Sequence, residues 1–532
     1  MVNLGNCPQK NFMQDYYLKI SRASELKDKK ERIIYRIFEI IPGAICWLTL
    51  IFCFLISYFK PVWAAVFIIS FVIYWLLRVI YFSFYLSSCY KRMRENEKVD
   101  WIKELNELRI KSWQEIYHLV LIPTYKEPLE ILRDTFSSLT EVDYPKEKMI
   151  VVLSIEERAG EEGGKVGEKI KEAFENRFFK FVLTFHPKNL PDEIAAKGSN
   201  DTWASRKAKE IIDQFKIPYK NVIVTSLDAD TKVFPKYFSC LTYYFLTEKD
   251  PLRSSFQPVP LFLNNILQSP PTSRIFAFSA SFWEMMCQER PEKLKTFSSH
   301  SMSFKALVDV DFRQVNVVSD DSRIFWQCFL KYNGNYKVIP IFYPISMDAN
   351  CAKSFLRTMK NVYLQQKRWA YGVADIPYYF FGFLKSRKVP IKKFLPLALT
   401  DFETFWSWAT NSIVIFMMGW LPLILGGENF RQSLIAYNLP RFTSHILTVS
   451  MIGLILSAYF AILLIPKGLD LGKRKYPILF LEWFLLPLIM IFFTSLPALE
   501  AQTRLMLGKY LGFYPTEKFR KSSIKNKSER LT

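Results

Sequence analysis

The sequence predicts an α/β domain whose mostly parallel sheet is covered by helices and flanked by transmembrane helices. Two observations support this fold class. Between residues 113 and 370, short apolar runs of strand length alternate with charged, helix-like stretches, a pattern typical of strand–helix–strand units. On both sides of this region lie apolar runs long enough for the ~20 residues that cross a bilayer. Hydrophobic residues make up 50% of the 532 residues, as expected for a chain that contacts lipid.

A polar, charged segment, 1–33, precedes the first apolar runs and has no features of a signal peptide. The runs 34–59 and 62–88 are joined at Lys60-Pro61, so we expect a transmembrane hairpin over 34–88. Lys and Arg residues flank both of its ends. The positive-inside rule therefore places residues 1–33 and the domain at 89–372 in the cytoplasm.

Four apolar runs within 89–372 predict buried strands: Tyr117–Ile122, Met149–Ile155, Phe181–Phe185 and Asn221–Leu227. Helices are expected between them, for example over Glu130–Leu139 and Ala204–Phe215. The Gly/Glu-rich run 161–167 predicts a surface loop. Ligands of such sheets bind beyond the carboxyl ends of the strands. We therefore expect the polar motifs at 123–127, 156–157 and 228–230, which follow three of these strands, to share one crevice.

The C-terminal part of the chain returns to apolar sequence. Residues 373–398 predict an interfacial helix region, 399–500 a transmembrane region with about three apolar segments (402–425, 444–465 and 477–498), and 501–532 a basic tail. Three spans would leave the tail outside, whereas its charge favours the cytoplasm. We therefore expect one segment to be broken or re-entrant, and Pro487 and Pro497 point to the last. The whole chain is predicted to be a multi-pass protein of the cell or inner membrane.

A formal net charge of +21 favours anionic partners such as lipid head groups or nucleotide phosphates. No basic tract is interleaved with aromatic residues, so nucleic acid is not an expected partner. The eight Cys residues are scattered, without a C-x-x-C pair. This spacing argues against a zinc site and against a disulfide framework.

Asp228 and Asp230 follow a Val-Ile-Val strand and stand one residue apart. In an extended segment this spacing puts both carboxylates on one face, where they can hold Mg²⁺ or Mn²⁺. The alternative is a polar turn after a strand.

Asp320 and Asp321 precede an amphipathic run, Ile324–Leu330. A carboxylate at this helix start can take a proton from an acceptor hydroxyl. The alternative is helix capping, for which Ser319 and the two Asp residues are suited.

Gln365, Arg368 and Trp369 share one face of a predicted helix. Arg offers a fork for a diphosphate, Gln an amide for a hydroxyl or phosphate, and Trp a flat surface for a sugar. The alternative is a helix at the lipid interface.

Lys197 stands beside Gly198, where a lysine can approach phosphates closely, and Asn200 follows two residues later. The alternative is a helix N-terminus with Asn200 or Asp201 as its cap.

With these residues in order, the chain resembles the membrane-bound branch of glycosyltransferase family 2, which includes cellulose and hyaluronan synthases. The resemblance covers about 113–370 and implies a nucleotide-diphosphate-sugar transferase (GT-A-like) fold. By this resemblance, Pro123, Tyr125 and Glu127 match the first nucleotide-binding loop, and Lys197 and Asn200 match a segment beside the donor. Asp228 and Asp230 match the D-x-D metal motif, and Asp321 matches the general base. The Q-x-x-R-W helix is matched by Gln365, Arg368 and Trp369. The T-E-D motif is replaced by Ser319-Asp320-Asp321, and Glu156 or Glu157 stands where an Asp that contacts the nucleobase is expected.

The resemblance implies an inverting, metal-dependent enzyme that uses a nucleotide-diphosphate sugar to extend a polysaccharide. The expected partners are the sugar donor, a glycan or lipid-linked acceptor, and membrane lipids. Transfer of a single sugar to a polyprenyl phosphate or another lipid carrier is an alternative. A non-catalytic membrane transporter or scaffold is another, and it would leave the carboxylates and the Q-x-x-R-W helix without a role.

Overall fold

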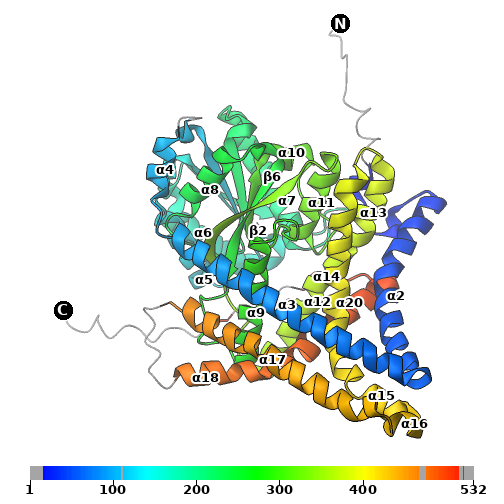
Figure 1. Ribbon diagram of the computed structural model, residues 1–532. Coiled ribbons are helices and arrows are strands. Elements are labelled where there is room, and N and C mark those ends of the chain that lie inside the picture. The colour runs from blue at the N-terminus through cyan, green and yellow to red at the C-terminus, as the bar shows by residue number, and fades with distance from the viewer. Residues whose placement is uncertain (1–15, 109–111, 467–474, 515–518, 521–532) are drawn as a thin grey trace.

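The computed structural model describes residues 16–108, 112–466, 475–514 and 519–520. It combines an eight-stranded sheet, covered by helices, with a group of long helices (Figure 1). The strand order is β3-β2-β1-β4-β7-β6-β8-β5. The strands are β1 (Tyr117–Thr124), β2 (Met149–Glu156), β3 (Lys180–His186), β4 (Val222–Ser226), β5 (Lys232–Val233), β6 (Ser254–Leu261), β7 (His300–Ser303) and β8 (Lys337–Ser346).

The first four strands are parallel and confirm the four strands predicted from sequence. In the other half of the sheet, β7 runs antiparallel to both β4 and β6, β5 runs antiparallel to β8, and β6 and β8 are parallel. Four of the seven pairings are therefore parallel, so the sheet is mixed with a parallel half. Within this half, β1, β2 and β4 are buried along almost their whole length, which explains their continuous apolar runs.

Helices cover both faces of this half. Successive side chains of a strand point to opposite faces. Leu119 and Leu121 of β1 pack in one apolar cluster with Ala204 and Ala208 of α7 (Lys197–Gln214). Val120 and Ile122 pack in another with Leu132 and Phe136 of α5 (Leu129–Thr140). The remaining helices of this part are α4 (Trp101–Glu107), α6 (Gly160–Phe174), α8 (Tyr237–Thr247), α9 (Pro271–Gln288), α10 (Phe304–Asp309), α11 (Asp320–Lys331) and α12 (Phe355–Ala370).

The prediction of a surface loop at 161–167 is wrong, because these residues form the first turns of α6. Two glutamates in the first turn favour a helix start through the helix dipole. Gly167 serves packing: a Cβ there would come within 2.4 Å of the Ile155 side chain. The glycine thus allows α6 to approach β2 closely.

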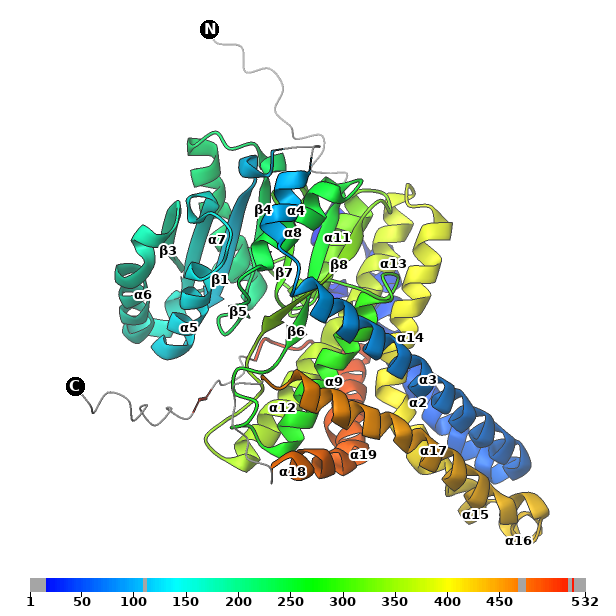
Figure 2. The ribbon, with the colours of Figure 1, turned by 60° about the vertical axis from the view of Figure 1, so that its left-hand side comes forward.

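Four helices among the described residues are long and apolar enough to cross a membrane. They are α2 (Lys29–Phe59), α3 (Pro61–Asn96), α17 (Leu434–Leu464) and the run Lys475–Met506. Figure 2 shows α2, α3 and α17 extending together away from the sheet, with α15 (Leu421–Leu425) and α16 (Gly427–Arg431) at their far end. The predicted run 402–425 falls mainly in α14 (Ile391–Met418), which is not one of the four.

The run Lys475–Met506 departs twice from α-helical hydrogen bonding. It comprises α18 (Lys475–Leu481), a 3-10 turn, α19 (Leu486–Met490), a π turn and α20 (Leu496–Met506). Pro487 and Pro497 lie in the first turns of α19 and α20, where a missing N–H is tolerated. The interruption expected from these two prolines is present.

The helix predicted after residue 372 is α13 (Asp375–Ser386). Tyr378, Tyr379 and Phe381 are buried, and the helix packs on α2 and α11. Its place at a lipid interface stays a prediction. The predicted terminal segments 1–33 and 501–532 lie partly outside the described residues.

Candidate active site

A cavity of about 1930 Å³ starts at the carboxyl ends of β1, β2 and β4 and continues between α9, α12 and the long helices α3, α14 and α17. The predicted site residues that line it are Pro123, Tyr125, Glu127, Glu156, Lys197, Asn200, Asp228, Asp230, Asp321, Gln365, Arg368 and Trp369. Asp320 and Glu157 are not part of its lining. The fold thus brings together residues up to 246 positions apart along the chain, from Pro123 to Trp369.

Asp228 and Asp230 occupy a turn that follows β4, closed by the N–H of Thr231 donating to the carbonyl of Asp228 at 2.8 Å. The expectation of an extended segment here is therefore wrong, although both residues still line the cavity. Asp228 Oδ1 lies 2.6 Å from Lys197 Nζ, and its Oδ2 accepts from Ser298 Oγ at 2.6 Å. Asp230 is buried, and its Oδ2 accepts from the N–H of Asp348 at 3.3 Å.

Lys197 links the two predicted carboxylate motifs. Besides Asp228, its Nζ lies 3.3 Å from Asp321 Oδ1. Burial acts to lower the pKa of Lys197, but the charges of Asp228 and Asp321 outweigh it and raise that pKa. Lys197 therefore stays protonated and holds the two carboxylates on one side of the crevice.

Asp320 and Asp321 have different surroundings, although they are neighbours at the start of α11. Asp321 is partly exposed to the cavity, with 27% of its side chain accessible, whereas Asp320 is buried. Burial, followed by the charge of Asp321, raises the pKa of Asp320 to about 7. Of the two, Asp321 is thus the carboxylate that an acceptor in the cavity can reach.

Gly198 makes this arrangement possible. A Cβ on Gly198 would come within 2.5 Å of the Asp320 Cβ. Because the glycine has no side chain, the first turn of α11 packs directly on the first turn of α7. That contact brings Asp321 next to Lys197.

The side chain of Glu127 stabilises the turn that follows β1. Glu127 Oε2 accepts from Thr124 Oγ1 at 2.5 Å and from the N–H of Tyr125 at 2.7 Å. Glu156, at the end of β2, is buried and paired with Arg158, and burial raises its pKa. Glu157 faces away and accepts from the N–H of Lys188 at 3.0 Å. Of the two glutamates proposed for this position, only Glu156 reaches the crevice.

Asn200 connects two strand ends. Its Nδ2 donates to the carbonyls of Thr124 and Ser154, at 3.3 and 3.0 Å, and its Oδ1 accepts from Ser154 Oγ at 2.6 Å. These bonds fix the rim of the crevice. A direct contact between Asn200 and a donor stays a prediction.

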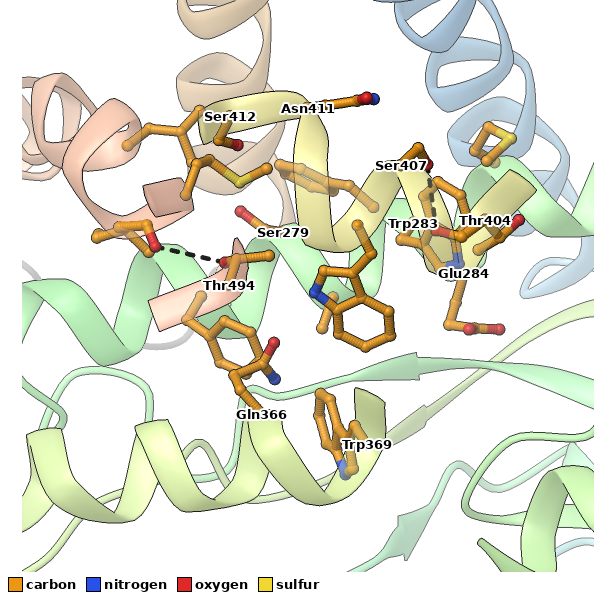
Figure 3. A pocket seen from close by; sticks show the side chains of 18 of the residues that line it. Ser279, Trp283, Glu284, Gln366, Trp369, Thr404, Ser407, Asn411, Ser412 and Thr494 are labelled. Carbon is orange, nitrogen blue, oxygen red and sulfur yellow. Dashed lines mark hydrogen bonds between the residues drawn. The ribbon is translucent and has the colours of Figure 1, made fainter. Parts of the chain in front are cut away.

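The Q-x-x-R-W helix, α12, presents its polar face to the cavity rather than to lipid. Trp369 packs against the rings of Phe276 and Phe297, with centroids 5.6 and 5.5 Å apart. Figure 3 shows Trp369 and Gln366 facing Ser279 and Trp283 of α9 across the cavity. This placement argues against the alternative of a lipid-interface helix.

Three residues near the crevice, Arg313, Arg520 and Phe513, were not identified from the sequence. Arg313 is buried and lies 3.2 Å from carboxylate oxygens of both Asp320 and Asp321. Arg520, in the tail, lies 2.6 Å from Asp348 and 2.7 Å from Asp134. Phe513 lines the cavity, with its ring centroid 4.8 Å from Arg368 Cζ. The local sequence of each carries no recognisable motif, so only the folded chain identifies them.

The oxygen ligands at this site suit a hard divalent cation. Asp228 and Asp230 supply only carboxylate oxygens, which Mg²⁺ and Mn²⁺ favour. No group of three or more His, Cys, Asp or Glu residues arranged to hold a metal occurs among the described residues. A cation here would therefore take part of its coordination shell from substrate phosphates, as Mg²⁺ usually does.

No family model matches the chain, and no curated protein matches it. Among solved structures, it is similar to a mannosyltransferase from Pyrobaculum calidifontis in complex with GDP-Man and Mn²⁺, with 14% identity, a TM-score of 0.40, and coverage of 73% of this chain and 99% of that one. It is also similar to residues 1–349 of S. aureus TarS in complex with UDP-GlcNAc, with 11% identity, a TM-score of 0.31, and coverage of 65% and 92%. At identities and TM-scores this low, the similarity says nothing about the substrate or mechanism of this protein.

Proposed function

We propose that this protein is an inverting, metal-dependent glycosyltransferase that uses a nucleotide-diphosphate sugar to extend a polysaccharide at the membrane. The observation that carries the proposal is the single cavity. It holds the Asp228 and Asp230 carboxylates, the Lys197–Asp321 pair and the polar face of α12, and it continues between long apolar helices.

Asp321 acts as the general base in this proposal. Its carboxylate takes the proton of the acceptor hydroxyl, whose oxygen attacks the anomeric carbon opposite the departing diphosphate. Lys197 and Arg313, both 3.2–3.3 Å from Asp321 Oδ1, orient that carboxylate. One displacement of this kind inverts the anomeric centre.

The leaving diphosphate meets positive charge on two sides. Asp228 and Asp230 would hold a divalent cation, which supplies charge neutralisation at the diphosphate when bound. Arg368 lies in the same cavity and has a guanidinium suited to phosphate. Burial lowers the pKa of Arg368, while Asp228 and Asp321 act in the opposite direction. The negative charge of a bound diphosphate would thus stabilise the charged guanidinium of Arg368, which is partly buried.

The cavity beyond Trp369 supports a glycan acceptor over a single lipid carrier. Its walls include the hydroxyl and amide side chains of Ser279, Ser407 and Asn411 (Figure 3). The buried atoms Gln366 Nε2 and Asn411 Oδ1 have no hydrogen-bond partner among the described residues. Sugar hydroxyls can satisfy such atoms, whereas the hydrocarbon of a polyprenyl chain cannot.

An even number of membrane crossings fits the charge distribution of the chain. α15 and α16 lie at the far end of the long helices, where Gly426 approaches Pro61, so α14 leads away from the sheet domain and α17 returns toward it (Figure 2). With α2, α3, α14 and α17 as the crossings, the sheet domain and the start of the run Lys475–Met506 lie on the same side. The basic flanks place that side in the cytoplasm, where nucleotide sugars are made.

The test is donor turnover by purified protein in membranes. We expect release of nucleotide diphosphate from one UDP- or GDP-sugar, with Mg²⁺ or Mn²⁺, and a product longer than one sugar. Asp230→Ala should abolish turnover and weaken donor binding while expression is retained. Full activity in excess chelator would overturn the metal requirement. A product of one sugar on a polyprenyl phosphate would favour the lipid-carrier alternative.

A further inference from the structure

A buried histidine lies behind the candidate active site and has no part in the proposed reaction. His300 belongs to β7, the strand that pairs with β4, and its side chain is fully buried. It is not part of the cavity lining, so it does not contact a substrate directly. Burial, followed by the charges of Arg313 and Lys197, lowers the pKa of His300 well below its usual value. The imidazole is therefore neutral at pH 7 and acts through the two groups that its ring nitrogens contact.

The hydrogen-bond partners of His300 determine which ring nitrogen carries the hydrogen. Nδ1 lies 3.2 Å from the carbonyl oxygen of Ser298, which can only accept, so Nδ1 is the donor. Nε2 lies 3.0 Å from Arg313 Nη2, and a guanidinium can only donate. Nε2 is therefore the acceptor of a bond from Arg313. The neutral tautomer with its hydrogen on Nδ1 satisfies both contacts, and no other form of the ring does.

Arg313 in turn holds the carboxylates at the start of α11. Its Nη1 lies 3.2 Å from Asp320 Oδ2 and 3.2 Å from Asp321 Oδ1. A guanidinium is a rigid, planar fork, so a bond at Nη2 fixes the direction in which Nη1 points. The backbone of Arg313 is held as well, because its carbonyl accepts from Thr202 Oγ1 at 2.9 Å. The contact between Arg313 and Asp321 therefore depends on the position of His300.

Ser298 anchors the imidazole from the other side. Its carbonyl accepts from Lys197 Nζ at 3.3 Å as well as from His300, and its hydroxyl donates to Asp228 Oδ2 at 2.6 Å. The φ of Ser298 is 41°, in the left-handed region that is unfavourable for a residue other than glycine. These hydrogen bonds stabilise that conformation. His300 thus joins the segment that contacts Asp228 to the arginine that contacts Asp321.

We propose that His300 is a positioning residue: through Arg313 it holds the Asp321 carboxylate where that carboxylate takes the proton of the acceptor hydroxyl. This inference rests on the proposed function, in which Asp321 is the general base. It adds to that function a residue that touches neither the donor nor the acceptor. A histidine that only filled the core would contribute to stability alone, so the two roles predict different kinetics.

Two substitutions separate the two bonds of His300. Asparagine can place its Nδ2 near the former Nδ1 position, but it has no atom at the position of Nε2. His300→Asn therefore retains the bond to Ser298 and loses the bond from Arg313. We expect its kcat to fall about 10- to 100-fold, the cost of a small displacement of a catalytic group, with the donor KM nearly unchanged. Glutamine reaches further and can offer Oε1 to Arg313, so His300→Gln should recover most of kcat.

The double variant His300→Asn/Arg313→Gln tests whether the effect passes through the arginine. If it does, the kcat of the double variant equals that of Arg313→Gln within about twofold, because His300 then has nothing left to orient. The rate measured is release of UDP or GDP from UDP-glucose, UDP-N-acetylglucosamine or GDP-mannose by the purified full-length protein with Mn²⁺. Thermal unfolding of each variant shows that it is folded.

His118→Asn is the matched control, because it removes another buried histidine. His118 lies in β1, outside the cavity lining, and its Nε2 is 2.8 Å from Thr242 Oγ1. This substitution should lower the temperature of unfolding and leave kcat unchanged.

Independent, multiplying effects of His300→Asn and Arg313→Gln would overturn the inference, as would a wild-type kcat in folded His300→Asn. A raised donor KM with unchanged kcat would also overturn it, because the histidine would then act on the donor. Should His300→Asn not fold, a kcat of folded His300→Gln as low as that of Arg313→Gln would overturn it. Absence of nucleotide release by the wild-type protein from every donor would instead contradict the proposed function itself.

Discussion

Two neighbouring aspartates at the start of α11 differ in burial and therefore in role. Asp321 faces the cavity between Lys197 and Arg313, and Asp320 is buried against Gly198. Asp321→Asn should lower kcat by ~10²–10⁴-fold, the range that general base catalysis supplies, with donor affinity nearly unchanged. The fall in kcat should be smaller for Asp320→Asn than for Asp321→Asn. An inactive Asp320→Asn beside an active Asp321→Asn would reverse the assignment.

Asp320 should also make stability depend on pH. The unfolded chain releases this proton near pH 3.8 and the folded chain near pH 7, so the folded chain binds more protons in between. The free energy of unfolding contributed by Asp320 therefore falls as pH rises through this window. Thermal unfolding in detergent at several pH values should show a smaller loss of stability in Asp320→Asn than in wild type. Equal slopes for the two proteins would contradict this prediction.

Substitution of Trp369 should separate chain extension from cleavage of the donor. This residue lines the cavity and is braced by Phe276 and Phe297, which hold its ring in place for a sugar to stack on. Loss of such a stacking partner costs ~0.5–1.5 kcal/mol beyond the lost area. Trp369→Ala should shorten the polymer while slow donor hydrolysis persists. Unchanged product length, measured by size-exclusion chromatography, would remove Trp369 from the acceptor site.

At the scale of elements, the contact between α7 and α11 positions the base. Gly198→Ala would place a Cβ 2.5 Å from that of Asp320, and overpacking of this kind costs ~1–3 kcal/mol. We expect reduced stability together with a larger fall in kcat, because Asp321 moves away from Lys197.

Gly164→Ala is the matched control on another helix. Its added methyl group would meet no atom closer than the Phe185 ring at 4.0 Å. In a helix, alanine is favoured over glycine by ~0.5–1 kcal/mol. Thermal unfolding and initial rates of both variants test the contact. Equal effects of the two substitutions would show that α7–α11 packing does not position Asp321.

At the scale of the whole molecule, charge and span number predict that the sheet domain is cytoplasmic. Glu161→Cys places a thiol on the exposed start of α6. All seven cysteines in the described part of the chain are buried, so background labelling should be low once Cys7 is replaced by Ser. An impermeant thiol reagent should label the variant only after lysis. Labelling in intact cells would place the domain outside and exclude a nucleotide-sugar donor made inside.

The sequence by itself determined the parallel half of the sheet, the long apolar helices and twelve of the cavity-lining residues. These features depend on local pattern: buried parallel strands are continuous apolar runs, and parallel strands end at one edge of the sheet. The mixed half could not be predicted in the same way, because β5 has two residues and β6 to β8 contain proline, serine and histidine.

Tertiary structure alone decided three further features. In the helix at 161–167, Gly163 and Gly167 allow close packing, whereas a composition-based prediction interprets the glycines as flexibility. Asp321 and Asp320 are distinguished by burial, which depends on Gly198, more than 120 residues earlier in the chain. The charges of Arg313 and Arg520 reach the site only where distant elements meet, because the field at a charged group depends on its spatial neighbours.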